Sequence, residues 1–201
     1  MTRNSLALER ERLLIAEEAA RLVLDEGLED FGLAKRKAAE HLGLGATRNL
    51  PRNVEVEAAV LERQSLFQTE EERAHVAHLR ATALEAMRLF ADYSPRLVGS
   101  ALKGTAHAAQ RITLHLFANS VEEVCFLLMD RRIPYDLGSR RLRFGGELQE
   151  LPSVSFVADD VEIEAVVFSV DGIRQAPLSP VDGRPMRRAS LADVEALLRE
   201  A

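Results

Sequence analysis

The fold of this chain is decided by the stretch LVGSALKGTAHAAQRITLHLF, residues Leu97–Phe117. Two apolar runs flank a connection rich in glycine and alanine, which predicts short strands over Arg96–Leu102 and Arg111–Ala118. Pro95 precedes the first run, and the apolar spacing before it is helical rather than alternating. Helices are therefore expected upstream of Pro95 and a β-sheet downstream.

The downstream half combines helix and strand signals. Asp193 lies three residues after Ser190, and this spacing predicts a capped terminal helix. Glycine and aspartate pairs mark the hairpin turns between the alternating segments. The expected elements are a helix from Ser120 to about Arg132, strands at Arg140–Phe144 and near Leu148, and a hairpin of Ser153–Ala158 with Val161–Ser169.

The upstream half is predicted to be helical. Gly27 ends the first helix, a second covers about Leu33 to Leu42, and Asn53 can cap a third. A fourth helix has a buried stripe at three- and four-residue spacing, formed by Val76, Leu79, Ala83, Ala86 and Phe90. The predicted class is α+β, with a helical region (residues 1–69) packed on a small mixed β-sheet flanked by helices (residues 70–201).

Composition sets the broad class. The 201 residues carry a formal net charge of −6, which argues against a protein that binds nucleic acid or anionic membrane over a broad surface. The one cysteine, Cys125, lies in an apolar run, where a buried inert thiol is the expected state. No signal peptide or membrane-spanning run is recognised, so a cytoplasmic protein is expected, and a homo-oligomer is compatible with the sequence.

The pattern of Gly99, Ser100 and Gly104 resembles the signature of the polymerase-β-like nucleotidyltransferase superfamily. In that signature a strand ends in Gly-Ser, a second glycine follows five residues after the first, and the next strand carries Asp-x-Asp. The resemblance extends from about Ala74 to Ser169 and includes the order of the elements. It implies a nucleotidyltransferase-like domain in which the Gly-Ser turn approaches a triphosphate and the aspartates hold magnesium ions.

The metal-binding carboxylates of that signature are missing here. The family spacing places them at Arg111 and Thr113, and the third family carboxylate corresponds to Glu162 or Glu164. One carboxylate does not hold two magnesium ions, and unit charges about 4 Å apart interact by about 4 kcal/mol at an effective dielectric constant near 20. An arginine at this position repels a dication, so metal-dependent nucleotidyl transfer is not expected, and no cofactor or metal site is predicted.

Several residues near the signature are candidates for contact with a ligand. His115 shares a strand face with Arg111 and Thr113, where it could contact a ligand or act as an acid or base, although a structural histidine is the favoured interpretation. Lys103 could reach a phosphate or lie exposed in a loop. The predicted ligand-binding set is Gly99, Ser100, Lys103, Gly104, Arg111, Thr113, His115 and Glu164.

Two groups of arginines have a simpler interpretation. One consists of Arg131, Arg132, Arg140, Arg141 and Arg143, and the other of Arg184, Arg187 and Arg188. Either group could bind an anion or nucleic acid. We expect solvated surfaces instead, with the first group paired to nearby acidic residues such as Asp130, Asp136 and Glu147.

The segment from Gly27 to Gly43 resembles the first two helices of a TetR-type helix-turn-helix, with the basic run Lys35 to Lys37 near DNA. A helix-turn-helix needs a turn of about three or four residues, but the loop from Gly43 to Asn53 is much longer. The helix that would read the bases begins with Glu55 and Glu57. DNA binding is therefore the less favoured hypothesis.

These observations lead to one expected function and two alternatives. The expected function is that of a catalytically degenerate nucleotidyltransferase-like protein that binds a nucleotide or another phosphorylated small molecule, or regulates through it. The first alternative is a DNA-binding transcriptional regulator that uses the N-terminal helices. The second is an active nucleotidyltransferase with displaced carboxylates.

Overall fold

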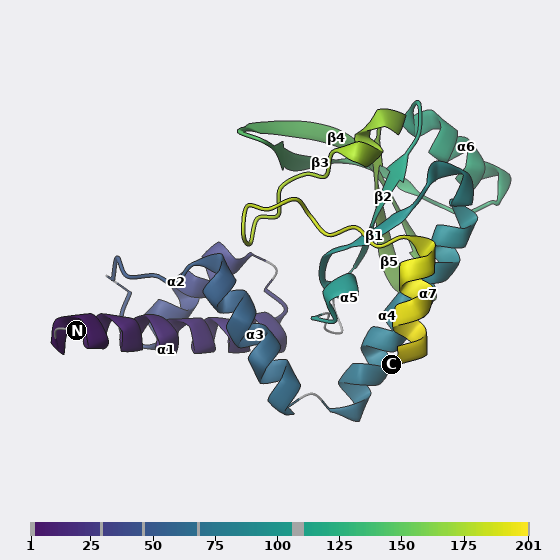
Figure 1. Cartoon of the computed structure of the whole chain (residues 1–201). Helices are drawn as coiled ribbons and strands as arrows, with labels where there is room; N and C mark the ends of the chain where they lie inside the picture. The colour runs from purple at the N-terminus through teal and green to yellow at the C-terminus, as the bar shows by residue number, and fades with distance from the viewer. Residues whose placement is uncertain (1–2, 29, 46, 68, 106–110, 201) are drawn as a thin grey trace. The chain divides into compact units, whose positions relative to one another are not determined.

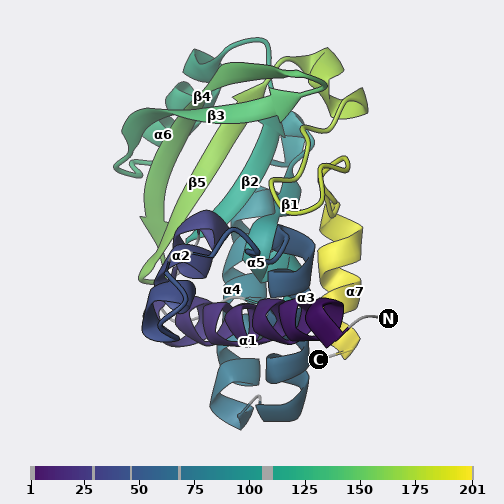
Figure 2. The ribbon, with the colours of Figure 1, turned by 90° about the vertical axis from the view of Figure 1, so that its left-hand side faces the viewer.

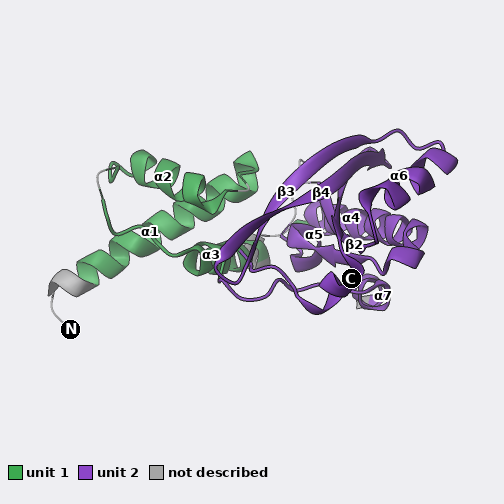
Figure 3. Ribbon diagram, turned by 90° about the horizontal axis from the view of Figure 1, so that it is seen from above, with its two compact units in different colours: residues 1–69, 180–182 green, residues 70–179, 183–201 purple. Residues whose placement is uncertain are grey.

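The computed structural model describes residues 3–28, 30–45, 47–67, 69–105 and 111–200. The chain divides into two compact units, coloured separately in Figure 3. Unit 1 comprises residues 1–69 together with 180–182, and unit 2 comprises residues 70–179 and 183–201. None of the helices in the described part of the chain combines the length and the apolar composition that a bilayer crossing requires.

Unit 1 is a set of three helices: α1 (Arg3–Glu26), α2 (Phe31–His41) and α3 (Asn53–Phe67). Gly27 follows α1 with a φ of +72°, a left-handed conformation that glycine adopts without strain, as predicted for the end of this helix. Asp30 caps α2 by accepting hydrogen bonds from the Gly32 and Leu33 amides. The unit has its own small core, formed by Ile15, Ala19, Ala20, Leu22, Val23, Ala34, Ala38, Ala39, Val56 and Val60.

The start of α3 differs from the prediction. Asn53 is the first residue of the helix and does not cap it, because its side-chain amide bonds to Lys35 Nζ at 2.7 Å and to the Pro180 carbonyl at 2.7 Å. The Glu55 carboxylate accepts the Arg52 amide at 2.7 Å instead. A backbone N–H at the start of the helix that would otherwise lack a partner is thus bonded by an acidic side chain in the first turn.

Unit 2 contains the sheet and the remaining helices (Figure 1). Its elements in chain order are α4 (Glu70–Leu89), η1 (Ala91–Tyr93), β1 (Arg96–Val98), α5 (Gly99–Lys103), β2 (Ile112–Phe117), α6 (Val121–Asp130), β3 (Asp136–Phe144), β4 (Glu147–Ala158), β5 (Val161–Phe168), η2 (Val170–Arg174) and α7 (Leu191–Glu200).

The five strands form one mixed sheet in the order β1-β2-β5-β4-β3. Strands β2 and β5 run parallel, while the other neighbouring pairs are antiparallel. Figure 2 shows β5 between β4 and β2. The helices together with this mixed sheet confirm the predicted α+β class.

The main core lies on one face of this sheet, under α4, α6 and α7. The stripe predicted for α4 is confirmed, since all five of its residues are buried. Cys125 of α6 is also buried in this core, as predicted. The terminal helix has the predicted cap: the Ser190 amide donates to Asp193 at 2.7 Å, and the Asp193 amide donates back to the Ser190 hydroxyl at 3.3 Å.

Three strand predictions were wrong in extent. The strand predicted at Arg140–Phe144 begins earlier, at Asp136. The strand predicted over Arg96–Leu102 ends at Val98, because Gly99 has a φ of +77° and the chain turns there into the short helix α5. β4 is one twelve-residue strand that passes through Pro152. Its pairing with β5 begins only at Ser153, so the missing Pro152 N–H lies outside that ladder.

Candidate functional site

The two faces of the sheet have different chemistry, as alternate residues of β2 show. Ile112, Leu114 and Leu116 are fully buried on the face that the helices cover, which we call the helix face. Thr113 and His115 point to the opposite face, because successive strand residues alternate. We call that opposite face, which also includes Ser153 and Glu164, the polar face.

The strand register brings several predicted site residues to the same part of the polar face. Thr113 pairs with Val98 on one side and with Glu164 on the other. Gly99 and Ser100 directly follow Val98 in the chain, and Arg111 directly precedes β2. The Gly-Ser turn, the two positions that lack carboxylates and Glu164 therefore lie near one end of β1, β2 and β5.

Glu164 is the one carboxylate that is buried on this face among the described residues, with 5% of its surface exposed. Its Oε2 accepts a hydrogen bond from Arg140 Nη1 at 2.5 Å. We predicted that Arg140 pairs with Asp130, Asp136 or Glu147, and the sequence gives no signal for its actual partner. β4 separates β3 from β5, so this ion pair reaches over a whole strand.

Glu162, the other possible third carboxylate, is in a different environment. Its side chain is 54% exposed, and its Oε1 lies 4.0 Å from Arg111 Nη1. An ion pair at this distance and exposure contributes little to stability. Among the described residues, no three His, Cys, Asp or Glu side chains are grouped so that they could hold a metal ion.

The backbone conformation at the two signature glycines, Gly99 and Gly104, favours glycine. Gly99 and Gly104 both have a φ of +77°, in the left-handed region. Apart from Gly99 and its chain neighbours, no heavy atom of the described residues lies within 4 Å of the position that a Gly99 Cβ would take. Ser100 is half-buried and Lys103 is exposed at the last position of α5. Of the glycine- and alanine-rich connection predicted between the two strands, residues 106–110 lie outside the described residues.

Arg80 of α4 is a neighbour of this turn that the sequence analysis missed. Its Nε donates to the Ala101 carbonyl at 3.1 Å and its Nη2 to the Leu102 carbonyl at 3.2 Å. Burial, with the positive charge of Arg187, lowers the pKa of Arg80. This guanidinium holds α5 in place and adds a positive charge beside the turn.

His115 is a buried neutral imidazole, with 1% of its surface exposed. Burial, followed by the charges of Arg188 and Arg140, lowers the pKa of His115 to about 3. Arg188 Nε donates to His115 Nδ1 at 3.1 Å, so the neutral ring has its proton on Nε2. A histidine in this state does not exchange protons near neutral pH, which favours the structural interpretation of His115.

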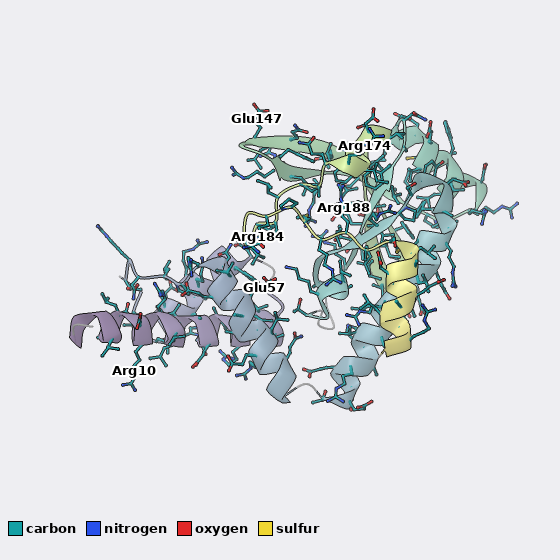
Figure 4. The ribbon with its side chains drawn as sticks, viewed as in Figure 1. Arg10, Glu57, Glu147, Arg174, Arg184 and Arg188 are labelled. Carbon is teal, nitrogen blue, oxygen red and sulfur yellow. The ribbon has the colours of Figure 1, made fainter. Side chains whose placement is uncertain are left out.

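Arg188, whose side chain is labelled in Figure 4, contacts His115 on the polar face. Its guanidinium carbon lies 5.1 Å from the centre of the Phe117 ring and 4.8 Å from that of Phe168. Arg188 Nη1 donates to the Gly172 carbonyl at 3.1 Å, and Nη2 is buried without a hydrogen-bond partner among the described residues. We predicted a solvated Arg188, and this prediction was wrong.

The basic run of α2 meets partners inside unit 1. Lys35 Nζ donates to the Asn53 side chain, and Lys37 Nζ lies 3.3 Å from Glu26 Oε2. The connection between α2 and α3 runs from residue 42 to residue 52, so the structure has no tight turn between these helices. A cationic helix presented for DNA needs side chains that are not committed in this way.

Comparisons with known proteins give few matches. No family model matches the chain, and no curated protein matches its sequence. A chain in the structure of a GLD-2/RNP-8 complex matches 53% of this chain, with a TM-score of 0.32 and 20% sequence identity. The matched region is 43% of that chain. A likeness of this size does not establish a shared architecture.

Proposed function

We propose that this protein is nucleotidyltransferase-like and binds a nucleotide or another phosphorylated small molecule on the polar face without catalysing metal-dependent transfer. The observation that carries this proposal is the ion pair between Glu164 and Arg140. In this arrangement the buried carboxylate already has a cationic partner. The position that the family signature gives to a metal-binding aspartate is occupied by Arg111, a second cation.

The charges near the turn favour an anionic ligand. Arg111 directly precedes β2, Lys103 is the last residue of α5, and Arg80 bonds two backbone carbonyls of α5. Gly99 leaves its backbone open to close approach. A phosphate near the turn would be attracted to these cations, whereas a magnesium ion would be repelled by them.

A thermal-shift experiment with ATP, GTP and inorganic phosphate tests this proposal in the 201-residue chain. We expect at least one of these probes to raise the midpoint of unfolding, because a ligand that binds only the folded state stabilises it. The shift should shrink in Ser100→Ala and Arg111→Ala. It should persist in Arg131→Ala, which removes an exposed arginine that follows α6.

Magnesium distinguishes this proposal from an active nucleotidyltransferase. Each probe is measured with excess magnesium and again with a chelator. We expect magnesium to reduce the shift, because it neutralises the phosphate charge that the arginines attract. The proposal would be refuted if no probe stabilised the chain, or if all three variants shifted like the parent. Stronger binding with magnesium would instead support an enzyme with displaced carboxylates.

A further inference from the structure

The first half of α1 exposes four leucines to solvent. The exposed fractions are 52% for Leu6, 46% for Leu8, 61% for Leu13 and 42% for Leu14, and no residue between Leu6 and Leu14 is buried. Burial begins at Ile15, where the helix meets the core of unit 1. A helical extension with this many exposed leucines has apolar surface that a second element could remove from water.

One side of this half-helix is already held by unit 1. The Asn49 side chain donates to the Leu8 carbonyl at 2.6 Å, and the Thr47 hydroxyl donates to Glu11. Arg12 forms an ion pair with Glu55 at 3.0 Å. Leu8, Glu11 and Arg12 thus mark the side that faces the loop and α3.

Leu6 and Leu13 lie together on a different side of the helix. They are seven residues apart, which is close to two helical turns, so they point in nearly the same direction from the helix axis. Around that axis, Leu8 points more than 120° away from both of them. Glu9 and Arg10 lie between them in the sequence, are exposed, and flank the line that joins the two leucines. Figure 4 shows Arg10 pointing away from α2 and α3.

The order of charges on this side is complementary to itself. When two such helices run parallel, with Leu6 opposite Leu6 and Leu13 opposite Leu13 of a second copy, Glu9 of each copy falls opposite Arg10 of the other, because the two residues flank the leucines on opposite sides. A two-fold axis produces each of these contacts twice. In an antiparallel arrangement Glu9 would face Glu9, and Arg10 would face Arg10, which is unfavourable.

We propose that two copies of this chain associate through the Leu6–Leu13 side of α1, with the two helices parallel about a two-fold axis. This inference is independent of the ligand proposed for the polar face. Two leucines and one ion pair per copy make a small contact, so we expect a reversible dimer in exchange with monomer rather than a permanent one.

Sedimentation velocity over a wide range of protein concentrations tests this proposal. We expect Arg10→Glu and Glu9→Arg each to weaken dimerisation by roughly tenfold, because each change replaces two attractive contacts with two repulsive ones. The double variant Glu9→Arg with Arg10→Glu exchanges the signs and should restore the parent affinity. Leu13→Asp should abolish the dimer, whereas Leu61→Asp, which alters a 47% exposed leucine of α3, should not.

Three results would overturn the proposal. The first is a parent chain that stays monomeric at every concentration. The second is a double charge exchange that fails to restore the dimer lost in the single variants, since that pattern assigns the charges to some other contact. The third is a monomeric parent that binds vesicles of anionic phospholipid through Leu6 and Leu13, which would assign this side of α1 to a membrane surface.

Discussion

The helix face and the polar face of the sheet share the same strands but are stabilised differently. On the helix face, Leu114 and Ile163 are fully buried among other apolar side chains. On the polar face, His115 and Glu164 are almost as buried, yet each depends on one arginine. The stability that comes from apolar packing is spread over many contacts, whereas the stability that comes from a buried polar pair depends on two groups.

This difference bears on what the polar face can do. A packed apolar face has no group that could exchange one partner for another. Arg140 and Arg188 are cations whose present partners come from the chain itself. Any anionic ligand that reached the polar face would compete with Glu164 for Arg140, so the face is both part of the fold and a candidate for binding.

The largest expected effect is on the helix face. Leu114→Ala should lower the free energy of unfolding by about 2–5 kcal/mol, because it removes buried methyl groups and leaves a cavity. Thr113→Ala, one residue away on the polar face, should cost less than about 1 kcal/mol. Urea denaturation of both variants gives the comparison. Equal losses would show that the two faces are not stabilised differently.

Removing one member of the Arg140–Glu164 pair should have an intermediate effect. Arg140→Ala leaves a buried carboxylate without its partner and should cost about 2 kcal/mol, less than a fully buried pair because the Arg140 side chain is 36% exposed. Arg141→Ala changes the neighbouring exposed arginine and should cost less than about 0.5 kcal/mol. A double variant, Arg140→Leu with Glu164→Leu, should recover most of the loss. If it does not, Glu164 is stabilised by other groups.

His115 should make stability depend on pH. Its pKa of about 3 in the folded chain lies below the ordinary value of 6.5, so the unfolded chain binds a proton that the folded chain does not. As far as His115 determines it, the free energy of unfolding is highest above pH 6.5. It falls as the pH drops toward 3, by about 1.4 kcal/mol per pH unit at most.

The free energy of unfolding, measured by urea denaturation at several pH values between 6.5 and 5, isolates this effect, because most carboxylates remain ionised in that range. His115→Gln keeps an acceptor for Arg188 but cannot take up a proton, so the slope should flatten. Thr113→Ala changes a side chain on the same face that carries no titratable group and should leave the slope unchanged. A parent chain with no slope in this range would mean that His115 can be protonated in the folded state.

The sequence predicted the elements whose signals are local. The α4 stripe is a repeat within one helix, the Ser190 cap is a three-residue pattern, and β2 is one alternating run. The short helix α5 was missed because five residues are too few to show a helical period. β4 was predicted as two strands, one near Leu148 and one at Ser153–Ala158, because each was assigned to its own hairpin turn. Only the register shows that a single strand pairs with β3 along its length and with β5 from Ser153 on.

The partners on the polar face were not predictable in the same way. Strand parity placed Arg111, Thr113 and His115 on one face. It does not say that Arg188, 73 residues later, donates to His115. Nor does it predict that Arg140 pairs with Glu164 rather than with an acidic residue nearer in the sequence. Such pairings depend on the order of strands in the sheet and on the path of the chain after β5.

The two edges of the sheet also affect the behaviour of the protein at high concentration. An uncovered edge strand offers free N–H and C=O groups to another molecule and promotes fibril growth. At one edge, Leu97 of β1 exchanges two hydrogen bonds of 2.9 Å with Ala189, so its outer backbone groups are already bonded. At the other, the Arg143 carbonyl of β3 accepts the Leu178 amide at 2.6 Å, and the exposed Arg141 side chain adds positive charge. We therefore expect concentrated folded chains to resist joining strand to strand into fibrils.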